Sequence, residues 1–414
     1  MSAHHDEPRS GTAANPNSEV AGSSPGQINL SSKRLGAGVM GCNDEFFGFA
    51  DNLILDGEPV SMRAHRGPRG VPVDGWETRR HGPGHDWALI RLATPGVVDR
   101  VIVDTGNFIN NAPVRISVSA AYFDGHPRQA RLRAHEDWDT LVEDSACRGN
   151  TQNEYVTGSS RVYTHLRLNI HPDGGVARVR AMGSVLPDPR LMPTRGNVAD
   201  VLMGCVVLDS SGGFGSPMNL VLPGTSHGIH DGWETRRRGD TDDDWVTFRL
   251  LDEIRLTAVG VHTTHFMGNA AEAVAFEYAC VADEAPAATA LWTTLVPRKE
   301  LVPDAVHRYV LDTPADATHL RLRIFPDGGV SRVEAYGEWA APQRDRIIGR
   351  WLTALPRMSL GDVLRGAGLT DTGVEAVLSA CDVSGADPKT VVNRVRGVLA
   401  AVDRERLDGM FFRH

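Results

Sequence analysis

A seven-residue sequence, Asp-Gly-Trp-Glu-Thr-Arg-Arg, occurs twice in this chain, at 74–80 and again at 231–237. The offset between the copies is 231 − 74 = 157 residues. A period of this length is a whole domain, because solenoid units repeat every 20–50 residues or so. A duplicated core would preserve a hydrophobic pattern, whereas these copies preserve charged and aromatic identities. We therefore look for function among the repeated polar groups.

The duplication extends beyond the heptapeptide. Residues 165–178 align with 319–332, and both segments contain Pro-Asp-Gly-Gly-Val. Trp87 aligns with Trp245, and Phe108 aligns with Phe266. The expected organisation is a disordered N-terminal tail rich in Ser, Gly and Pro, two repeats, a Pro-rich linker between them and a C-terminal extension. The boundaries are 1–33 for the tail, 34–186 and 198–341 for the repeats, 187–197 for the linker and 342–414 for the extension.

Apolar residues alternate with polar ones inside both repeats, as at 114–120, 166–170, 274–278 and 320–324. Period-two alternation between turn signals predicts short antiparallel strands. The predicted fold class is all-β, with two tandem sandwiches. In the extension, apolar residues return at helical spacing, and Ser359, Thr370 and Asp387-Pro388 are start signals. We expect three or four short helices there, with structural covering as the favoured role and docking, oligomerisation or regulation left open.

The composition limits the kinds of partner and the cellular compartment that we expect for this protein. The chain has 43 basic and 52 acidic residues, a net charge of −9, which gives no reason to expect nucleic acid or an anionic membrane as partner. Five dispersed cysteines without a C-x-x-C pair predict neither a disulfide framework nor a zinc site. The sequence contains no apolar run of about 18 residues and no signal-peptide core. We expect a cytoplasmic protein.

The heptapeptide supplies carboxylate and guanidinium groups side by side. In an extended segment Glu77 and Arg79 share one face, while Trp76 and Arg80 share the other. Surface ion pairs beside an anchoring Trp contribute only about 0–1 kcal/mol, and a purely structural role stays open for each residue. The functional interpretation is a proton-handling carboxylate beside guanidinium groups that bind a substrate carboxylate. Glu234, Arg236 and Arg237 repeat the arrangement in the second copy.

Two positions exchange residue types between the copies. His85 aligns with Asp243, and Asp104 aligns with His262. We expect an imidazole–carboxylate contact in each repeat, reversed in order. Asp86 aligns with the unchanged Asp244. The catalytic candidates are Glu77, His85, Asp86 and Asp104.

Metal and nucleophilic catalysis have less support from the sequence. Outside the tail, the histidines lack metal-ligand spacing, and a long-range site made by His85, Asp86 and Asp104 is a weaker alternative. The sequence has no G-x-S-x-G. We expect neither a metal nor a cofactor.

At these residues the chain resembles the allantoicase family. The matching segments are Asn-Asp-Glu-Phe-Phe at 43–47, Asp-Gly-Trp-Glu-Thr-Arg-Arg-His at 74–81, Gly-His-Asp-Trp at 84–87, Val-Asp-Thr at 103–105, and Pro-Asp-Gly-Gly-Val at 172–176 and 326–330. The resemblance covers roughly residues 36–339. It implies two jelly-roll domains of the galactose-binding-like type, and hydrolysis of allantoate to ureidoglycolate and urea in purine breakdown. We expect a homo-oligomer whose substrate is allantoate.

The chemistry of allantoate suits the repeated groups. Arg79 or Arg80 would hold its carboxylate, and an acid among Glu77, His85 and Asp86 would protonate the departing urea nitrogen. The expected substrate-binding set is Trp76, Arg79, Arg80, Arg178, Glu234, Arg236, Arg237, His262 and Arg332.

The second copy departs from the family pattern. It has His-Thr-Thr-His at 262–265 in place of Asp-Thr, and it lacks a proline after Asn-Ala at 269–270. These departures count against a fully competent second site. Two other functions stay open: a non-catalytic pair of ligand-binding sandwiches, and an amidohydrolase that attacks the ureido carbonyl and releases ammonia.

Overall fold

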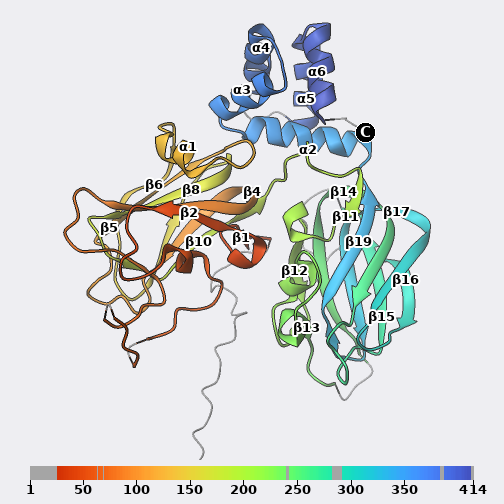
Figure 1. The fold of residues 1–414 in the computed structure, drawn as a ribbon. Helices are drawn as coiled ribbons and strands as arrows, with labels where there is room; N and C mark the ends of the chain where they lie inside the picture. The colour runs from red at the N-terminus through yellow and green to blue at the C-terminus, as the bar shows by residue number, and fades with distance from the viewer. Residues whose placement is uncertain are drawn as a thin grey trace, which may run out of the picture.

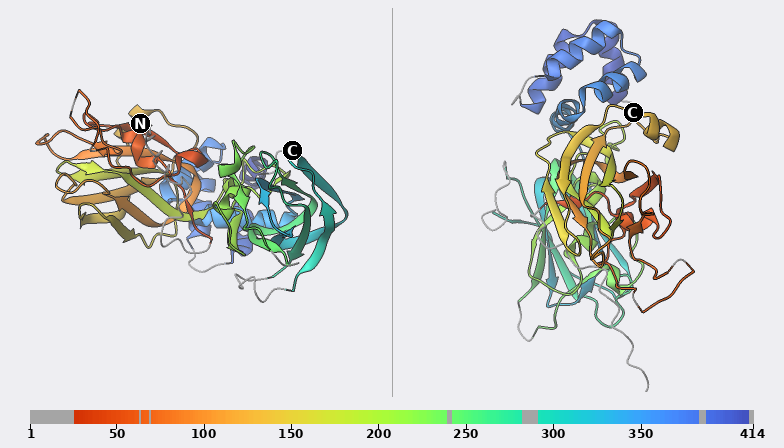
Figure 2. Two further views of the ribbon diagram at one scale, coloured as in Figure 1. Left: turned by 90° about the horizontal axis from the view of Figure 1, so that it is seen from below. Right: turned by 90° about the vertical axis from the view of Figure 1, so that its left-hand side faces the viewer.

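The structure is a computed structural model that describes residues 26–411, except for 63, 69, 239–241, 282–290 and 383–386. Figure 1 shows two antiparallel β domains beside each other, with a group of helices across one end of both. Two further views place the helices at the same end (Figure 2). This is the expected all-β architecture with a helical C-terminal extension.

The first domain is built around β4 (Asp86–Asp104), a strand of 19 residues. Its eight-stranded sheet has the order β1 (Ile28–Asn29), β10 (Arg178–Val185), β4, β8 (Val162–His171), β5 (Arg115–Ala121) and β6 (Asp139–Ala146). Two more strands, β2 (Gly38–Cys42) and β7 (Gln152–Val156), also pair with β4. The alternating segments predicted at 114–120 and 166–170 therefore fall on β5 and β8.

The second domain repeats this plan around β14 (Asp244–His262), which also has 19 residues. Its seven-stranded sheet has the order β11 (Arg195–Asn197), β19 (Arg332–Glu338), β14, β17 (Val306–Phe325), β15 (Ala273–Ala279) and β16 (Thr293–Glu300), with β12 (Val206–Ser210) paired to β14. The two long strands begin 244 − 86 = 158 residues apart. This equals the offset of the aligned Trp and Phe residues, and the predicted duplication is confirmed.

Both ends of β4 lie at one end of the sandwich. The strand pairs first with β8 and then with β10, with an irregularity at 91–96. Asp86 pairs with Ile170 near the end of β8, and Asp104 pairs with Arg178 at the start of β10. Because a short loop joins β8 to β10, β4 must fold back on itself. We call the end with this loop the motif end and the end with residues 91–96 the corner end.

Short strand pairs close the motif end of each repeat. In the first repeat β3 (Trp76–Glu77) pairs with β9 (Gly175–Val176). In the second, β13 (Trp233–Glu234) pairs with β18 (Gly329–Val330). The two repeated motifs, the heptapeptide and Pro-Asp-Gly-Gly, thus meet at the same place in both domains.

The first repeat begins earlier than expected. β1 pairs with β10, and Ile28 and Leu30 are buried in the core with 4% and 0% exposure. The prediction of a disordered tail over 1–33 is therefore wrong for residues 28–33, because two apolar side chains at alternate positions anchor them to the sheet. Residues 1–25 lie outside the described part of the chain.

The described residues between 341 and 411 form five helices rather than three or four. These are α2 (Ala341–Ala354), α3 (Arg357–Gly366), α4 (Asp371–Cys381), α5 (Pro388–Val398) and α6 (Ala401–Phe411). Thr370 caps α4 as predicted, since its side chain accepts a hydrogen bond from Gly373 N. Ser359 lies inside α3 instead of starting it, and its hydroxyl donates to Tyr122 O at 3.0 Å. None of the described helices is long and apolar enough to cross a membrane.

Helix α2 braces the corner ends of the two repeats. Arg346 and Arg350 form ion pairs of 2.5 and 2.7 Å with Asp252 of the second repeat. Trp351 is fully buried, and its ring packs 6.4 Å from that of Tyr122 in the first repeat. The structure therefore gives the extension the covering role expected for it.

Candidate functional site

The heptapeptide is fastened to the Pro-Asp-Gly-Gly loop. Trp76 pairs with Val176, and Glu77 pairs with Gly175. Trp76 is fully buried, and its indole Nε1 donates to Asp44 O at 2.7 Å. Trp76 therefore anchors the motif in the core, as burial of a large aromatic ring favours. This burial argues against the predicted contact of Trp76 with substrate.

Buried arginines hold the first residue of each heptapeptide. Arg178 donates to both carboxylate oxygens of Asp74, at 3.0 and 2.9 Å, and its side chain is 3% exposed. Arg332 forms the matching pair with Asp231 at 2.9 Å and is 4% exposed. Because the guanidinium groups are buried and already paired, these arginines position the motif. This geometry argues against their predicted role in substrate binding.

One aromatic ring explains two of the repeated glycines. A Cβ atom on Gly175 would lie 2.1 Å from Phe108 Cδ1, and one on Gly75 would lie 2.7 Å from Phe108 Cε2. In the second repeat a Cβ on Gly329 would lie 2.0 Å from Phe266 Cδ1. The heptapeptide and the Pro-Asp-Gly-Gly loop pack so closely on this ring that a side chain would not fit at these glycines. Packing therefore explains why both repeats have glycine at these positions.

Three heptapeptide residues nevertheless line open space. A pocket of about 740 Å³ at the motif end of the first repeat is lined by Asp74, Glu77 and Arg80. Asn111, in the loop after β4, donates its amide to Glu77 Oε1 at 2.7 Å. Arg80 forms an ion pair of 2.9 Å with Asp173, and its side chain is 40% exposed. The pocket thus holds an oriented carboxylate, a guanidinium and a side-chain amide.

Arg79 points away from this pocket. It pairs with Asp44 at 2.7 Å, its guanidinium lies 4.2 Å from the centroid of the Phe46 ring, and it is 61% exposed. The expectation that Glu77 shares a face with Arg79 is wrong, because β3 ends at Glu77 and strict alternation stops there. Of the two arginines predicted as a carboxylate clamp, Arg80 is the one that lines the pocket.

The expected contact between His85 and Asp104 is wrong. The His85 ring packs against His171 with centroids 4.7 Å apart. Asp104 is 2% exposed and accepts from Gly106 N at 2.7 Å and from Gln152 Nε2 at 3.3 Å. His85, which precedes β4, and Asp104, its last residue, therefore have different partners.

The second repeat shows the same separation. Asp243 forms an ion pair of 2.6 Å with Arg323, and His262 lies 3.2 Å from Glu334. Burial lowers the pKa of His262, which is 4% exposed. This burial argues against the predicted role of His262 in substrate binding.

Asp86 is buried beside the start of β4. It is 7% exposed and accepts from Asn43 Nδ2 at 2.6 Å. No three His, Cys, Asp or Glu side chains in the described part of the chain come together as metal ligands would. The alternative metal site of His85, Asp86 and Asp104 is therefore not assembled.

The second repeat keeps the carboxylate–amide pair but changes its surroundings. Asn269 donates to Glu234 Oε1 at 2.7 Å, as Asn111 does to Glu77. Arg236 lies over the Phe214 ring at 5.5 Å, and Arg237 is exposed. The hydrogen-bonded Glu–Asn pair is therefore present in both repeats and does not show which of them has the active site.

A loop of different length does distinguish them. Asn52 and Asn219 are equivalent, since each donates to the glycine carbonyl that follows the motif aspartate, at 3.0 and 2.8 Å. The separation from asparagine to aspartate is 74 − 52 = 22 residues in the first repeat and 231 − 219 = 12 in the second. The longer loop supplies residues 60–62 and 71–73 to the pocket wall.

Two features of the pocket were not predicted from the sequence. Asn111 lies in a polar loop that turn formation explained equally well, and the wall at 60–62 and 71–73 carries no repeated motif. The sequence did contain one signal for this wall. The loop between the asparagine and the heptapeptide is ten residues longer in the first repeat, and such an insertion indicates that the surroundings of the motif differ between the two repeats.

Comparison with known proteins identifies the family. The family model described as "Allantoicase repeat" matches residues 28–186 and again 197–340. A probable allantoicase of Streptomyces avermitilis is 39% identical over 338 residues, 78% of this chain and 88% of that protein. The allantoicase of Dictyostelium discoideum is 34% identical over 73% of this chain and 85% of its own length. A crystal structure of allantoicase from Saccharomyces cerevisiae superposes with a TM-score of 0.65 and 31% identity, covering 76% of this chain and 93% of that one. The chain belongs to the allantoicase family.

Proposed function

We propose that this protein hydrolyses allantoate to ureidoglycolate and urea in the motif-end pocket of the first repeat. The observation that carries the proposal is the convergence of Glu77, Arg80 and Asn111 on one pocket of about 740 Å³. Relatives named allantoicase, 34–39% identical, support the reaction. Purine breakdown is the corresponding cellular role.

The substrate has groups that match this pocket. Allantoate carries one carboxylate and two ureido groups on a central carbon. Arg80 uses one nitrogen to bind Asp173 and has further N–H donors for the substrate carboxylate. Side-chain amides such as that of Asn111 suit the ureido groups, which both donate and accept hydrogen bonds.

The reaction needs one proton carrier. Hydrolysis breaks a C–N bond at the central carbon and forms a C–O bond to water, and a proton of that water ends on the urea nitrogen. Asp74, the other carboxylate that lines the pocket, is paired with Arg178, so Glu77 is the one placed to take this proton and deliver it. The hydrogen bond from Asn111 fixes one carboxylate oxygen and leaves the other for the proton. Such general acid–base assistance contributes roughly 10²–10⁴-fold.

The test compares matched variants in the two repeats. Purified wild-type protein, Glu77→Gln and Glu234→Gln are incubated with allantoate, with and without a chelator, and urea is measured. Gln preserves the size of the side chain and removes its capacity to carry a proton. We expect urea release to fall about 10²–10⁴-fold in Glu77→Gln and to stay at the wild-type level in Glu234→Gln. Equal loss in both variants, or no loss in Glu77→Gln, would overturn the assignment to the first repeat.

The same assay separates the competing functions. Ammonia in place of urea would identify an amidohydrolase that attacks the ureido carbonyl. Binding of allantoate by calorimetry without either product would identify a ligand-binding protein that shares the fold.

A further inference from the structure

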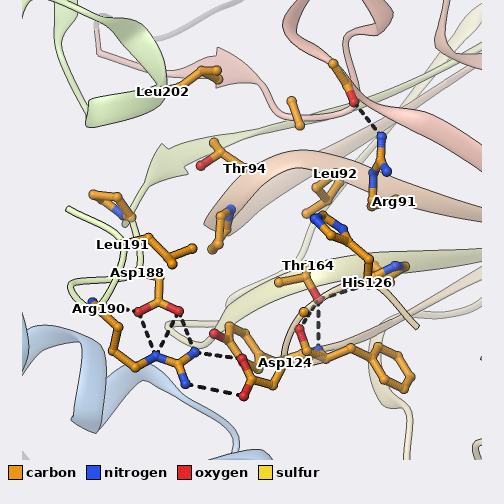
Figure 3. Close-up of a pocket in the computed structure, with 18 of the residues that line it drawn as sticks. Arg91, Leu92, Thr94, Asp124, His126, Thr164, Asp188, Arg190, Leu191 and Leu202 are labelled. Atoms are coloured by element: carbon orange, nitrogen blue, oxygen red, sulfur yellow. Dashed lines mark hydrogen bonds and ion pairs between the residues drawn. The ribbon is translucent and has the colours of Figure 1, made fainter. Parts of the chain in front are cut away.

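A second pocket lies at the corner end of the first repeat, away from the motif end. Its volume is about 600 Å³, and it shares no lining residue with the pocket that contains Glu77. Figure 3 shows that it lies between the turn of β4 at 91–95, the linker at 187–192 and Leu202 of the second repeat. Gly36 and residues 122–126 and 164–165 of the first repeat complete its lining.

The charged groups of this pocket are not all paired with one another. Asp124 and Asp188 both bind Arg190, at 2.7 and 2.5 Å (Figure 3). Arg91 donates a hydrogen bond to Gly36 O at 2.9 Å and has no carboxylate partner among the described residues. Because Arg190 engages both carboxylates of the lining, the guanidinium of Arg91 is left to bind an anionic group of a ligand.

Two histidines with unused nitrogens line the same pocket. His165 is 1% exposed, and its Nε2 has no hydrogen-bond partner among the described residues. His126 is exposed and makes no hydrogen bond or ion pair with the part of the chain that the structure describes. An unpartnered buried imidazole nitrogen costs free energy unless a ligand or water satisfies it.

Local hydrogen bonding favours one tautomer of His165. Phe123 N donates to Thr164 Oγ1 at 2.8 Å, and the same hydroxyl lies 2.9 Å from His165 Nδ1. The hydroxyl proton is best placed on the short contact to Nδ1, since its other acceptors are 3.4 and 3.5 Å away. The Nε2 of His165 then carries a proton and is a hydrogen-bond donor.

The second repeat provides an internal comparison. His319 has the same contact with Thr318 at 2.9 Å and the same unpartnered Nε2. There, however, helix α2 covers the equivalent corner, and its Arg350 donates to Leu251 O at 3.4 Å and to Asp252 at 2.7 Å. The unpartnered nitrogen is thus a feature of both repeats. The open pocket beside Arg91 is where the first repeat differs.

We propose that this pocket is a binding site for a small organic monoanion with a planar or apolar body. Its carboxylate lies against Arg91 and His126, and its body packs on Leu92, Leu191 and Leu202. Since the lining includes both repeats and the linker, a bound ligand also stabilises their relative arrangement.

The test uses 2-naphthoate as probe and the uncharged 2-naphthalenemethanol as its matched control. Each is titrated calorimetrically into the full chain, and allantoate hydrolysis is measured separately on the same preparations. We expect 2-naphthoate to bind more tightly than the alcohol. Arg91→Gln should weaken its binding about 10- to 100-fold without changing urea release. Arg115→Gln, an exposed ion-paired arginine on β5, should leave both unchanged.

Several outcomes would overturn this site. These are no binding of 2-naphthoate to the wild-type chain, equal binding of the acid and the alcohol, or undiminished binding by Arg91→Gln. If Arg91→Gln fails to fold, His126→Ala serves instead, because the side chain of His126 is exposed. Unchanged binding by His126→Ala would count against the proposal. Failure of allantoate hydrolysis with intact 2-naphthoate binding would reject the proposed function and leave this site standing.

Discussion

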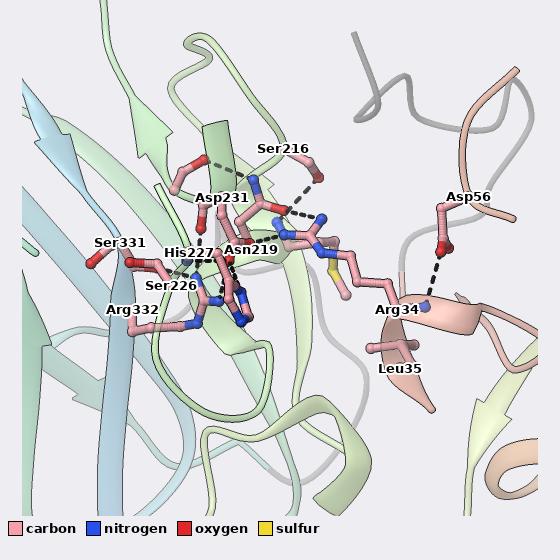
Figure 4. Close-up of polar contacts among 12 residues, drawn as sticks. Arg34, Leu35, Asp56, Ser216, Asn219, Ser226, His227, Asp231, Ser331 and Arg332 are labelled. Atoms are coloured by element: carbon pink, nitrogen blue, oxygen red, sulfur yellow. Dashed lines mark hydrogen bonds and ion pairs between the residues drawn. The ribbon is translucent and has the colours of Figure 1, made fainter. Parts of the chain in front are cut away.

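Arg34 of the first repeat forms an ion pair with Asp231, the residue that opens the heptapeptide of the second repeat (Figure 4). The other terminal nitrogen of Arg34 donates to Asn219 Oδ1 at 3.0 Å. Asp231 also accepts from the buried Arg332 at 2.9 Å. The Asp231 carboxylate therefore binds one arginine of its own repeat and one arginine of the other repeat.

These two contacts should differ in their contribution to stability. Arg332→Gln leaves Asp231 without its buried partner, and we expect a loss of about 3–5 kcal/mol in the free energy of unfolding. Arg34→Gln removes a side chain that is 34% exposed, and the expected loss is about 1 kcal/mol. Urea unfolding measures both, with Arg178→Gln as the first-repeat counterpart of Arg332→Gln. Equal losses for Arg34→Gln and Arg332→Gln would contradict the burial argument.

The close approach of Gly175 to Phe108 gives a prediction that separates stability from activity. In Gly175→Ala the new Cβ would meet the buried ring, which should cost roughly 1–3 kcal/mol. Because Gly175 pairs with Glu77, urea release should fall as well. Gly329→Ala meets Phe266 in the same way, and we expect a similar loss of stability with little loss of activity. Loss of activity in Gly329→Ala at a temperature where the variant is folded would contradict this.

The sequence predicted what local pattern and duplication determine. The strand alternation, the repeat offset and the Thr370 cap all depend on neighbours within a few residues or on comparison of the copies. The structure confirms them. The start of the first repeat was missed because Ile28 and Leu30 are too few to produce a periodic signal, although pairing with β10 orders them.

The site was only partly predictable, because its neighbours come from distant segments. The exchange of residue types between His85–Asp104 and Asp243–His262 indicated a contact, yet in the structure all four side chains have partners outside the exchanged pairs. Trp76 is conserved between the copies for burial, and Arg178 for an internal ion pair. Comparison of the two copies cannot tell such residues, which are repeated for packing, from Glu77, which is also repeated but lines a pocket.

Adjacent arginines provide a direct test of the carboxylate clamp. Arg80→Gln removes a guanidinium from the pocket, and we expect KM for allantoate to rise about 10- to 100-fold, as for loss of a charged hydrogen bond. Arg79→Gln should change KM little, because Arg79 contacts Asp44 and Phe46 instead. Thermal unfolding of both variants controls for the lost ion pairs. A larger effect of Arg79→Gln would place the substrate on the other side of the motif.

Loss of the hydrogen bond between Asn111 and Glu77 should lower turnover. Asn111→Ala frees the Glu77 carboxylate to rotate, and we expect kcat to fall about 10- to 100-fold. Asn269→Ala breaks the same bond to Glu234 in the second repeat and should leave kcat unchanged. Steady-state kinetics on both variants measures this. A matching fall in Asn269→Ala would show that both repeats turn over.

Buried histidines should make the fold sensitive to mild acid. Burial lowers the pKa of His165 from 6.5 to about 4, and burial also lowers the pKa values of His262 and His319. As pH falls below 6.5 the unfolded chain takes up protons that folded His165 does not, and stability declines until pH about 4. The decline is at most about 1.4 kcal/mol per pH unit for each histidine. Asp243, whose pKa the hydrogen bond from Arg323 lowers from 3.8, contributes only below this range.

Urea unfolding at pH 7, 6 and 5 tests the contribution of His165 to this pH dependence. We expect the free energy of unfolding of the wild-type chain to fall across the series. In His165→Gln the fall should be smaller, because one of the groups that titrates only after unfolding has been removed. Gln retains an amide that can still bond to Thr164, which limits the structural cost of the change. An unchanged slope in the variant would show that folded His165 takes up its proton as readily as the unfolded residue does.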